Sequence, residues 1–136
     1  TAMTQGRYPS LGEPVVTMFP LNPDVMYIKR VIGLPGDIVS LSEKGLTINN
    51  IDYPFTFAGQ KKFKVKDKLL NHNIYDVVIE DVNYQVIVDL NKGFPLIEDI
   101  KVPEGSFYLL GDNLTNSGDS RMYGSVPWRY FKGSAL

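Results

Sequence analysis

The chain has 136 residues, with 14 basic and 15 acidic side chains, a single His and a formal charge of −1. This length suits one domain whose core needs no disulfide or metal, and 43% apolar residues against 21% charged residues exclude wholesale disorder. The near-zero charge argues against a general nucleic-acid binder, and the absence of Cys excludes a disulfide framework, a thiolate zinc site and a Cys nucleophile.

Short runs rich in Val, Ile, Tyr and Phe, separated by Gly and Pro, make up most of the sequence. Runs of this kind are typical of strands. In chain order, the predicted strands cover residues 15–19, 26–32, 38–41, 46–48, 75–79, 84–89, 107–110 and 124–126. A turn or two of helix is predicted over residues 64–71, and no longer window keeps the apolar period of a helix. The sequence therefore predicts a mostly β domain with little helix.

Residues 27–37 place two cations inside a strongly apolar strand that ends in a turn rich in Gly and Pro. By strand alternation, Lys29 faces one side of the strand and Arg30 faces the other. A strand buried on either face must therefore bury a cation. Burial lowers the pKa of a Lys, and a neutral Lys can accept a proton from a hydroxyl. The alternative is an edge strand whose two cationic side chains reach out to water.

Residues 60–68 contain five lysines, namely Lys61, Lys62, Lys64, Lys66 and Lys68. In an extended strand Lys64 and Lys66 share one face, and Phe63 and Val65 share the other. One interpretation is a solvated hairpin edge that its lysines protect from further pairing. The other is attraction to an anionic lipid surface.

Residues 111–121 consist mostly of Gly, Asp, Asn, Ser and Thr, which bend the backbone and hydrogen-bond to it locally. One interpretation is an elaborate surface turn. A calcium loop is excluded, because Leu114 and Tyr123 fall where the loop needs a side-chain oxygen and a bidentate Glu. The sequence contains no nucleophile elbow, Walker loop or dinucleotide fingerprint, so no cofactor is predicted. The single His, His72, has no acid or nucleophile beside it, and we expect it to be solvated.

Two of these segments, residues 27–37 and the polar segment that begins at residue 111, resemble conserved boxes of the bacterial type I signal peptidases. Residues 27–37 resemble the lysine box, and residues 111–127 resemble the C-terminal box. A third segment, Gly12-Glu13-Pro14-Val15-Val16, resembles the family's Gly-Asp-Ile-Val-Val strand and precedes Lys29 by a typical distance. The three boxes occur in the family's order from about residue 12 to the C-terminus, around a variable insertion near residues 50–100.

The resemblance implies a signal-peptidase-like fold of short antiparallel strands in folded sheets or a partial barrel. It also implies a membrane-anchored serine endopeptidase with a Ser–Lys dyad and no cofactor or metal. Such an enzyme cleaves signal peptides from exported preproteins after small-x-small motifs, on the outer face of the cytoplasmic membrane. The expected partners are therefore these signal peptides and the membrane lipid surface, and no nucleic acid.

The site residues carry over from the family by their positions in the boxes. Lys29 matches the general base, and Ser117 matches the residue that hydrogen-bonds and orients it. Asp119 and Arg121 match a supporting ion pair, and Ser120 matches the Ser between them. The pocket walls that accept Ala-like side chains match Val16, Tyr27 and Ile28. The resemblance also implies that the substrate lies extended beside the strand of the lysine box and adds to the sheet edge.

The sequence departs from the family at two points. The family's nucleophile lies in a Ser-x-Ser-Met-x-Pro-Thr box behind a transmembrane anchor, and none of the eight Ser residues fits that box. We therefore expect these 136 residues alone to be catalytically inactive, because the oxyanion donors come from the same box. In addition, Leu114-Thr115 replaces the family's usual Arg-Asp.

Three interpretations stay open at this point. The first is an extracytoplasmic catalytic domain that starts after the nucleophile box. The second is a non-catalytic relative that binds preprotein or signal-peptide tails through the same groove. The third is a Ser–Lys self-cleaving repressor peptidase with a DNA-binding partner domain, which the boxes fit poorly.

We predict one domain over residues 1–136. Its parts are a scar or linker at 1–11, core with the lysine box at 12–49, the variable insertion at 50–100 and core with the C-terminal box at 101–136. Without the nucleophile segment, we expect Lys29 to be more exposed, and its pKa less lowered, than in the complete enzyme. We also expect the apolar residues 18–21 to contact a membrane, a partner or another copy of the chain.

Overall fold

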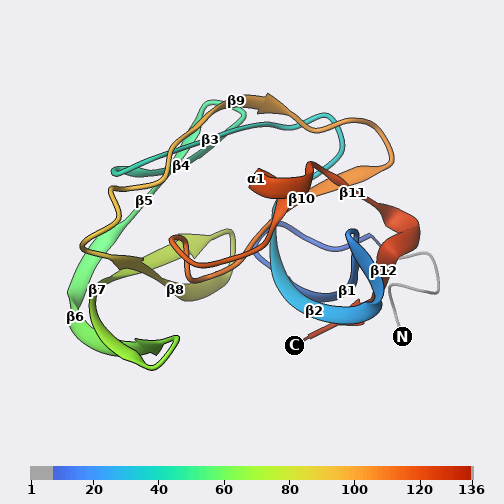
Figure 1. Ribbon diagram of the computed structural model, residues 1–136. Helices are drawn as coiled ribbons and strands as arrows, with labels where there is room; N and C mark the ends of the chain where they lie inside the picture. The colour runs from blue at the N-terminus through green and yellow to red at the C-terminus, as the bar shows by residue number, and fades with distance from the viewer. Residues whose placement is uncertain (1–7, 136) are drawn as a thin grey trace.

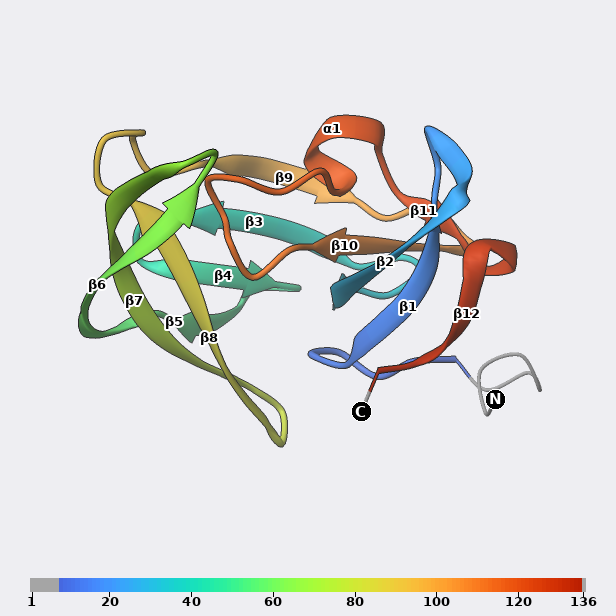
Figure 2. The same ribbon diagram turned by 60° about the horizontal axis from the view of Figure 1, so that its bottom comes forward.

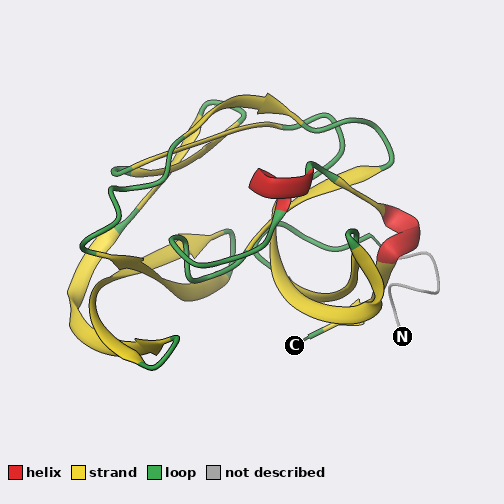
Figure 3. Ribbon diagram, in the orientation of Figure 1, coloured by secondary structure: helices red, strands yellow, loops and turns green. Residues whose placement is uncertain are grey.

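The computed structural model describes residues 8–135, so the predicted scar at Thr1, Ala2 and Met3 lies outside the described residues. Figure 3 shows that strands dominate and that the helical pieces are short. The strands are β1 (Pro14–Phe19), β2 (Asn22–Gly33), β3 (Ile38–Ser42), β4 (Gly45–Ile48), β5 (Ile51–Pro54), β6 (Thr56–Val65), β7 (Lys68–Ile79), β8 (Val82–Asp89), β9 (Ile97–Lys101), β10 (Ser106–Leu110), β11 (Val126–Pro127) and β12 (Phe131–Ser134). The helical pieces are α1 (Ser120–Tyr123) and the 3₁₀ turn η1 (Trp128–Tyr130). The predicted mostly β fold class is confirmed.

The strands form three antiparallel sheets. The first has the order β11-β10-β2-β1-β12, the second β5-β4-β3-β9 and the third β6-β7-β8. Figures 1 and 2 show the sheets curling around the middle of the molecule, with the β6-β7-β8 sheet on the side away from the two termini. The described residues thus form a partial barrel with a long β6–β7 ribbon.

Two hydrophobic clusters lie on opposite faces of the first sheet. The larger cluster contains Ile32 of β2 and also takes residues from β3, β4, β7, β8 and β10. The smaller cluster contains Val31 of β2, together with Val15, Phe107 and Leu109. Successive residues of a strand point to opposite faces, so a strand covered on both faces needs a continuous apolar run. This explains why the second half of β2 reads as an unbroken hydrophobic stretch.

The turn after β2 is determined by its glycines and one carboxylate. A Cβ at Gly33 would lie 2.9 Å from side-chain atoms of both Val39 and Val102, so only glycine fits between them. Gly36 has a φ of +86°, in the left-handed region that favours glycine. The Asp37 carboxylate accepts the Leu34 N–H at 2.8 Å and closes the turn. The chain therefore leaves the first sheet at a fixed angle and enters β3.

Several sequence predictions of local structure are wrong. Residues 64–71, predicted as helix, form the end of the β6–β7 hairpin instead. Lys66 does not lie on a strand face with Lys64, because Lys66 and Asp67 form the turn, with φ values of 48° and 67°. The pattern also missed β5, β9, β12 and the first part of β6. Of the strand predicted over residues 124–126, only Val126 lies in a strand, β11.

The prediction that His72 is solvated is also wrong. His72 is fully buried, although strand alternation places it on the face of β7 opposite to the core residues Val77 and Ile79. The Phe63 ring packs edge-on against the imidazole at a centroid distance of 5.2 Å. Nδ1 of His72 lies 2.8 Å from the Leu70 carbonyl oxygen, whereas Nε2 has no hydrogen-bond partner among the described residues. His72 thus belongs to the interior of the ribbon.

Candidate active site

Lys29 lies in the middle of β2 and is only 9% exposed. Its cross-strand partner is Val15 of β1, so its stem lies on the face that carries the smaller cluster. The Lys29 Nζ donates a hydrogen bond of 2.9 Å to the Ser117 Oγ. The Tyr27 ring lies beside the same amine, with its centroid 5.1 Å from Nζ. Strand and loop residues 88 positions apart therefore meet at one amine.

The surroundings of Lys29 lower its pKa from the ordinary value of 10.5. Desolvation is the largest cause, because an apolar environment disfavours the charged ammonium. The Asp119 carboxylate opposes this effect, the Arg121 guanidinium adds to it, and Asp112 opposes it more weakly. A larger fraction of the amine is consequently neutral at a given pH than in an exposed Lys.

The loop that carries Ser117 is held by the fully buried Asp119. Its Oδ1 accepts the Arg121 Nε–H at 2.9 Å, and its Oδ2 accepts the Arg121 Nη2–H at 2.6 Å. Oδ2 also accepts the Gly111 N–H at 3.0 Å. Arg121 Nη1 donates to the Leu114 carbonyl at 2.6 Å. The ion pair thus joins both ends of the loop and fixes the position of Ser117.

Ser120 ties the same loop to the first sheet. Its Oγ accepts the buried Leu109 N–H at 2.9 Å, which anchors α1 to β10. Asp119 caps α1 as well, because its side chain accepts the Arg121 N–H at 3.1 Å. The three predicted supporting residues therefore lie together behind Ser117.

Gly111 was not predicted to belong to the site. A Cβ at this position would overlap the Ser117 Oγ and would lie 2.7 Å from the Ser117 Cβ and 3.3 Å from the Lys29 Nζ. The hydrogen bond between Lys29 and Ser117 therefore needs a residue without a side chain at position 111. The sequence signal was its place directly after an apolar strand, at the start of the polar loop.

Asp112 was not predicted to belong to the site either, and it binds the second cation of β2, Arg30. Arg30 binds it through two hydrogen bonds, Nε to Oδ1 at 3.0 Å and Nη2 to Oδ2 at 2.9 Å. The third donor, Nη1, bonds to the Gly12 carbonyl at 2.8 Å, and the guanidinium lies 4.0 Å from the Tyr84 ring centroid. The polar loop contains two acids, Asp112 and Asp119, and the sequence does not indicate which of them binds Arg30. The fold shows that it is Asp112.

The predicted pocket walls do not all lie on one face of the sheet. Val16 and Ile28 are cross-strand neighbours, and Ile28 is 65% exposed. Tyr27 lies on the opposite face beside Lys29 and packs edge-on against Phe19 at 4.6 Å. An open hollow of about 150 Å³ is lined by Pro14, Ile28, Lys29, Arg30 and Asp112.

Two further properties concern residues 8–135 as a whole. Within this range, no three His, Cys, Asp or Glu side chains gather closely enough to hold a metal ion. The helices described in it are also too short to cross a membrane.

Comparison with known proteins gives a consistent result. The profile of the family described as "Signal peptidase, peptidase S26" matches residues 3–136. Signal peptidase I of Rickettsia conorii is 36% identical over 95% of this chain and 51% of its own length. Signal peptidase I of Buchnera aphidicola is 29% identical over 96% of this chain and 54% of its own length. The chain thus spans about half the length of these curated relatives.

A solved structure has the same fold. The crystal structure of a signal peptidase I from Enterococcus faecalis superposes with a TM-score of 0.59 and covers 96% of this chain and 98% of that one. Its sequence identity to this chain is 23%, so this likeness concerns the fold. Profile, relatives and fold agree, and the chain belongs to the peptidase S26 family of signal peptidases.

Proposed function

We propose that this chain is the catalytic domain of a signal peptidase I. In this proposal it removes signal peptides from exported preproteins after small-x-small motifs, on the outer face of the cytoplasmic membrane. The observation that carries the proposal is the buried Lys29 amine, which has a lowered pKa and donates to the Ser117 Oγ. This arrangement suits a general base that works without a His.

The proposed chemistry starts with neutral Lys29. One of its N–H bonds is directed to Ser117, which leaves the nitrogen lone pair free to accept a proton. A serine hydroxyl gives that proton to Nζ while its oxygen attacks the scissile carbonyl, and the ammonium then returns the proton to the leaving amine. Water hydrolyses the resulting acyl-enzyme with the same amine as base. Because none of the eight Ser residues fits the nucleophile box, we assign the attacking serine to another segment of the full-length protein.

The open edge of β2 is the proposed place for the substrate backbone. The Val31 N–H and C=O both bond to the Gly12–Glu13 segment on the β1 side. By alternation, the backbone groups of Arg30, Ile28 and Met26 point to the other edge. There β10 pairs only with residues from Arg30 onward, which leaves Ile28 and Met26 open to an added strand. The exposed Ile28 side chain lines the adjoining hollow and would contact small substrate side chains.

The full-length protein provides the test. We expect Lys29→Met to lower cleavage of a reporter preprotein with an Ala-x-Ala site by about 10²–10⁴-fold or more, because it removes the general base. The matched control is Lys44→Met, an exposed Lys in the β3–β4 turn, which should cleave like the wild type. Turnover by Lys29→Met at the control rate contradicts the assignment.

The same experiment separates the enzyme from a non-catalytic binder. If the protein is a binder, its full-length wild type would bind the reporter preprotein at every pH tested and would produce no mature product. The enzyme should show cleavage that rises with pH as Lys29 loses its proton.

A further inference from the structure

The end of the β6–β7 ribbon is strongly cationic. Residues 60–73 hold five lysines and one aspartate, which gives a formal charge of +4 with His neutral, whereas the whole chain has −1. All five lysines are exposed, and the single acid, Asp67, lies in the turn itself. Such a concentration of like charges creates a positive local potential that attracts anionic partners.

One face of the ribbon combines this charge with apolar surface. Lys64 pairs directly with Leu69 across the ribbon, so both side chains lie on the same face as Lys62. Leu69 is 66% exposed. The other face holds the partly buried Phe63 and Val65. A leucine surrounded by lysines is a combination that suits the boundary between lipid headgroups and acyl chains.

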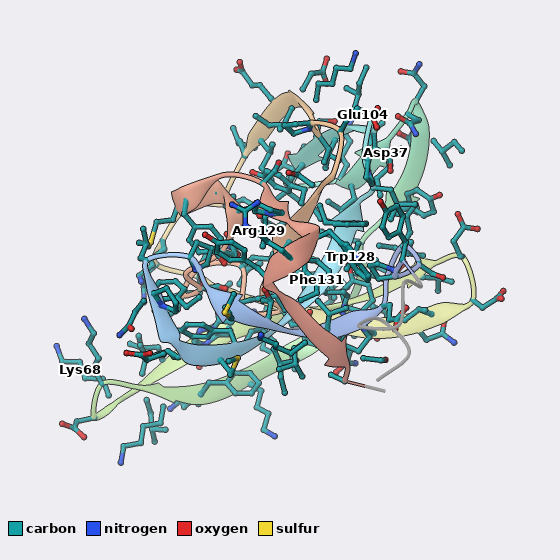
Figure 4. All side chains as sticks on the ribbon, turned by 90° about the vertical axis from the view of Figure 1, so that its right-hand side faces the viewer. Asp37, Lys68, Glu104, Trp128, Arg129 and Phe131 are labelled. Atoms are coloured by element: carbon teal, nitrogen blue, oxygen red, sulfur yellow. The ribbon has the colours of Figure 1, made fainter. Side chains whose placement is uncertain are left out.

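The ribbon end extends toward the same side as the β1–β2 hairpin. In Figure 4 Lys68 lies at the far lower left of the view, and the blue β1–β2 hairpin also extends to the left. Figure 2 shows both ends, with α1 between them, at the top of the view. The hairpin presents Leu21 and Met26, which are 64% and 50% exposed. One flat surface placed on this side would meet apolar side chains at the hairpin and cations at the ribbon.

We propose that the end of the β6–β7 ribbon is a contact site for anionic lipid, with Lys62 and Lys64 at the headgroups and Leu69 at their boundary with the acyl chains. The proposal adds a lipid class and a segment to the membrane location given under the proposed function, and it rests on that location. Charge complementarity selects an anionic surface over a neutral one, and the exposed Leu69 favours a lipid over a soluble polyanion.

Vesicle binding by the 136-residue chain tests the proposal without any cleavage, so its failure is distinguishable from failure of the peptidase assignment. We expect binding to vesicles of phosphatidylglycerol and phosphatidylcholine at low salt, and much weaker binding to phosphatidylcholine alone. Lys62→Glu with Lys64→Glu should weaken the binding by about 20-fold or more, given an effect of about fivefold for each lysine near an anionic surface. The difference should shrink at about 0.5 M salt, since screening shortens the range of the attraction.

The matched control is Lys44→Glu with Lys101→Glu, two exposed lysines of the β3–β4 turn and β9 that change the net charge equally. This control should keep most of the wild-type binding, and Lys62→Gln with Lys64→Gln should fall between the two. Circular dichroism checks that each variant is folded. Equal losses in both Glu pairs, equal binding to neutral vesicles, or binding to polyglutamate without binding to anionic vesicles would each overturn the proposal.

Discussion

At the scale of single residues, Lys29 links stability to pH. Its folded-state pKa lies below the ordinary value of 10.5, so the unfolded chain binds more protons between these two pKa values. The contribution of Lys29 to the free energy of unfolding, taken as the difference between the wild type and Lys29→Met, should therefore rise with pH in that window and level off above about 10.5. The contribution is absent in Lys29→Met.

Denaturant titrations of the two proteins at several pH values measure this difference. NMR titration of the Lys29 amine in this chain gives the pKa directly. The sequence led us to expect a more exposed Lys29 than in the complete enzyme; the residue is buried here, and its comparison with the complete domain stays a prediction. A wild-type stability that falls with pH relative to Lys29→Met would refute the linkage.

Gly111 offers a second residue-scale prediction. Gly111→Ala should break the hydrogen bond between Lys29 and Ser117, because the new Cβ overlaps the Ser117 Oγ. We expect a loss of about 1–3 kcal/mol in the free energy of unfolding, which is typical of overpacking. Gly93→Ala is the matched control, since a Cβ there meets nothing within 4 Å. An unchanged Lys29 amine resonance in Gly111→Ala would contradict the predicted loss of the hydrogen bond between Lys29 and Ser117.

The sequence predicted some of these residues for a clear reason. If β2 is buried on either face, strand alternation places a cation in the interior, whereas an edge strand would leave both cations in water. Both Lys29 and Arg30 have little exposed surface, which supports the first interpretation. Alternation did not identify the partner of Arg30, because the choice of Asp112 depends on how a distant loop folds back. The prediction that His72 is solvated failed for the same reason, since its burial comes from the packing of Phe63 in another strand.

At the scale of elements, β2 is covered on one edge and half open on the other. We predict that the Met26 and Ile28 amides exchange hydrogen faster than those of Tyr27 and Lys29, because only the latter point toward β1. A peptide with an Ala-x-Ala end should slow the exchange at Met26 and Ile28 if it adds to this edge. Hydrogen exchange followed by NMR measures both effects. Uniform protection along residues 26–29 in the free chain would contradict the open edge.

Two of the elements that the sequence missed, β6 and β9, share one property. β6 is largely exposed and carries lysines where an inward-facing strand has apolar residues, and β9 has one buried residue. Such strands have weak alternation and are defined by pairing with a neighbour. The helix predicted over residues 64–71 failed because two non-glycine residues, Lys66 and Asp67, adopt positive φ to make the turn.

At the scale of the whole molecule, the β6-β7-β8 sheet supports the polar loop of residues 111–121 in the candidate active site. The Ile87 N–H donates to the Asp112 carbonyl at 2.9 Å, and the Leu114 N–H donates to the Ile87 carbonyl at 3.0 Å. The Asp89 N–H donates to the Thr115 Oγ1 at 2.9 Å. Leu114 and Thr115, the departures from the family's usual residues, thus join the loop to β8, where Leu114 packs in the larger cluster.

Thr115→Val tests this connection. We expect it to lower the free energy of unfolding by about 1 kcal/mol, because the Asp89 N–H loses its acceptor. Thr47→Val is the matched control, since its hydroxyl donates to Asp52 at an exposed position and should cost much less. Thermal and denaturant unfolding compare the two variants, and equal losses would show that β8 does not hold the loop.

The opposite placement of Lys29 and Arg30 on β2 has a consequence for how the strand finds its neighbours. A slip by one residue would place the Arg30 guanidinium in the buried position that the Lys29 amine now occupies. An amine can shed its charge there, but a guanidinium keeps its charge at any physiological pH. The misaligned hairpin would hold a permanent, unmatched ion among Val15, Val31 and Leu109. We therefore expect the two adjacent cations to disfavour a one-residue slip between β1 and β2.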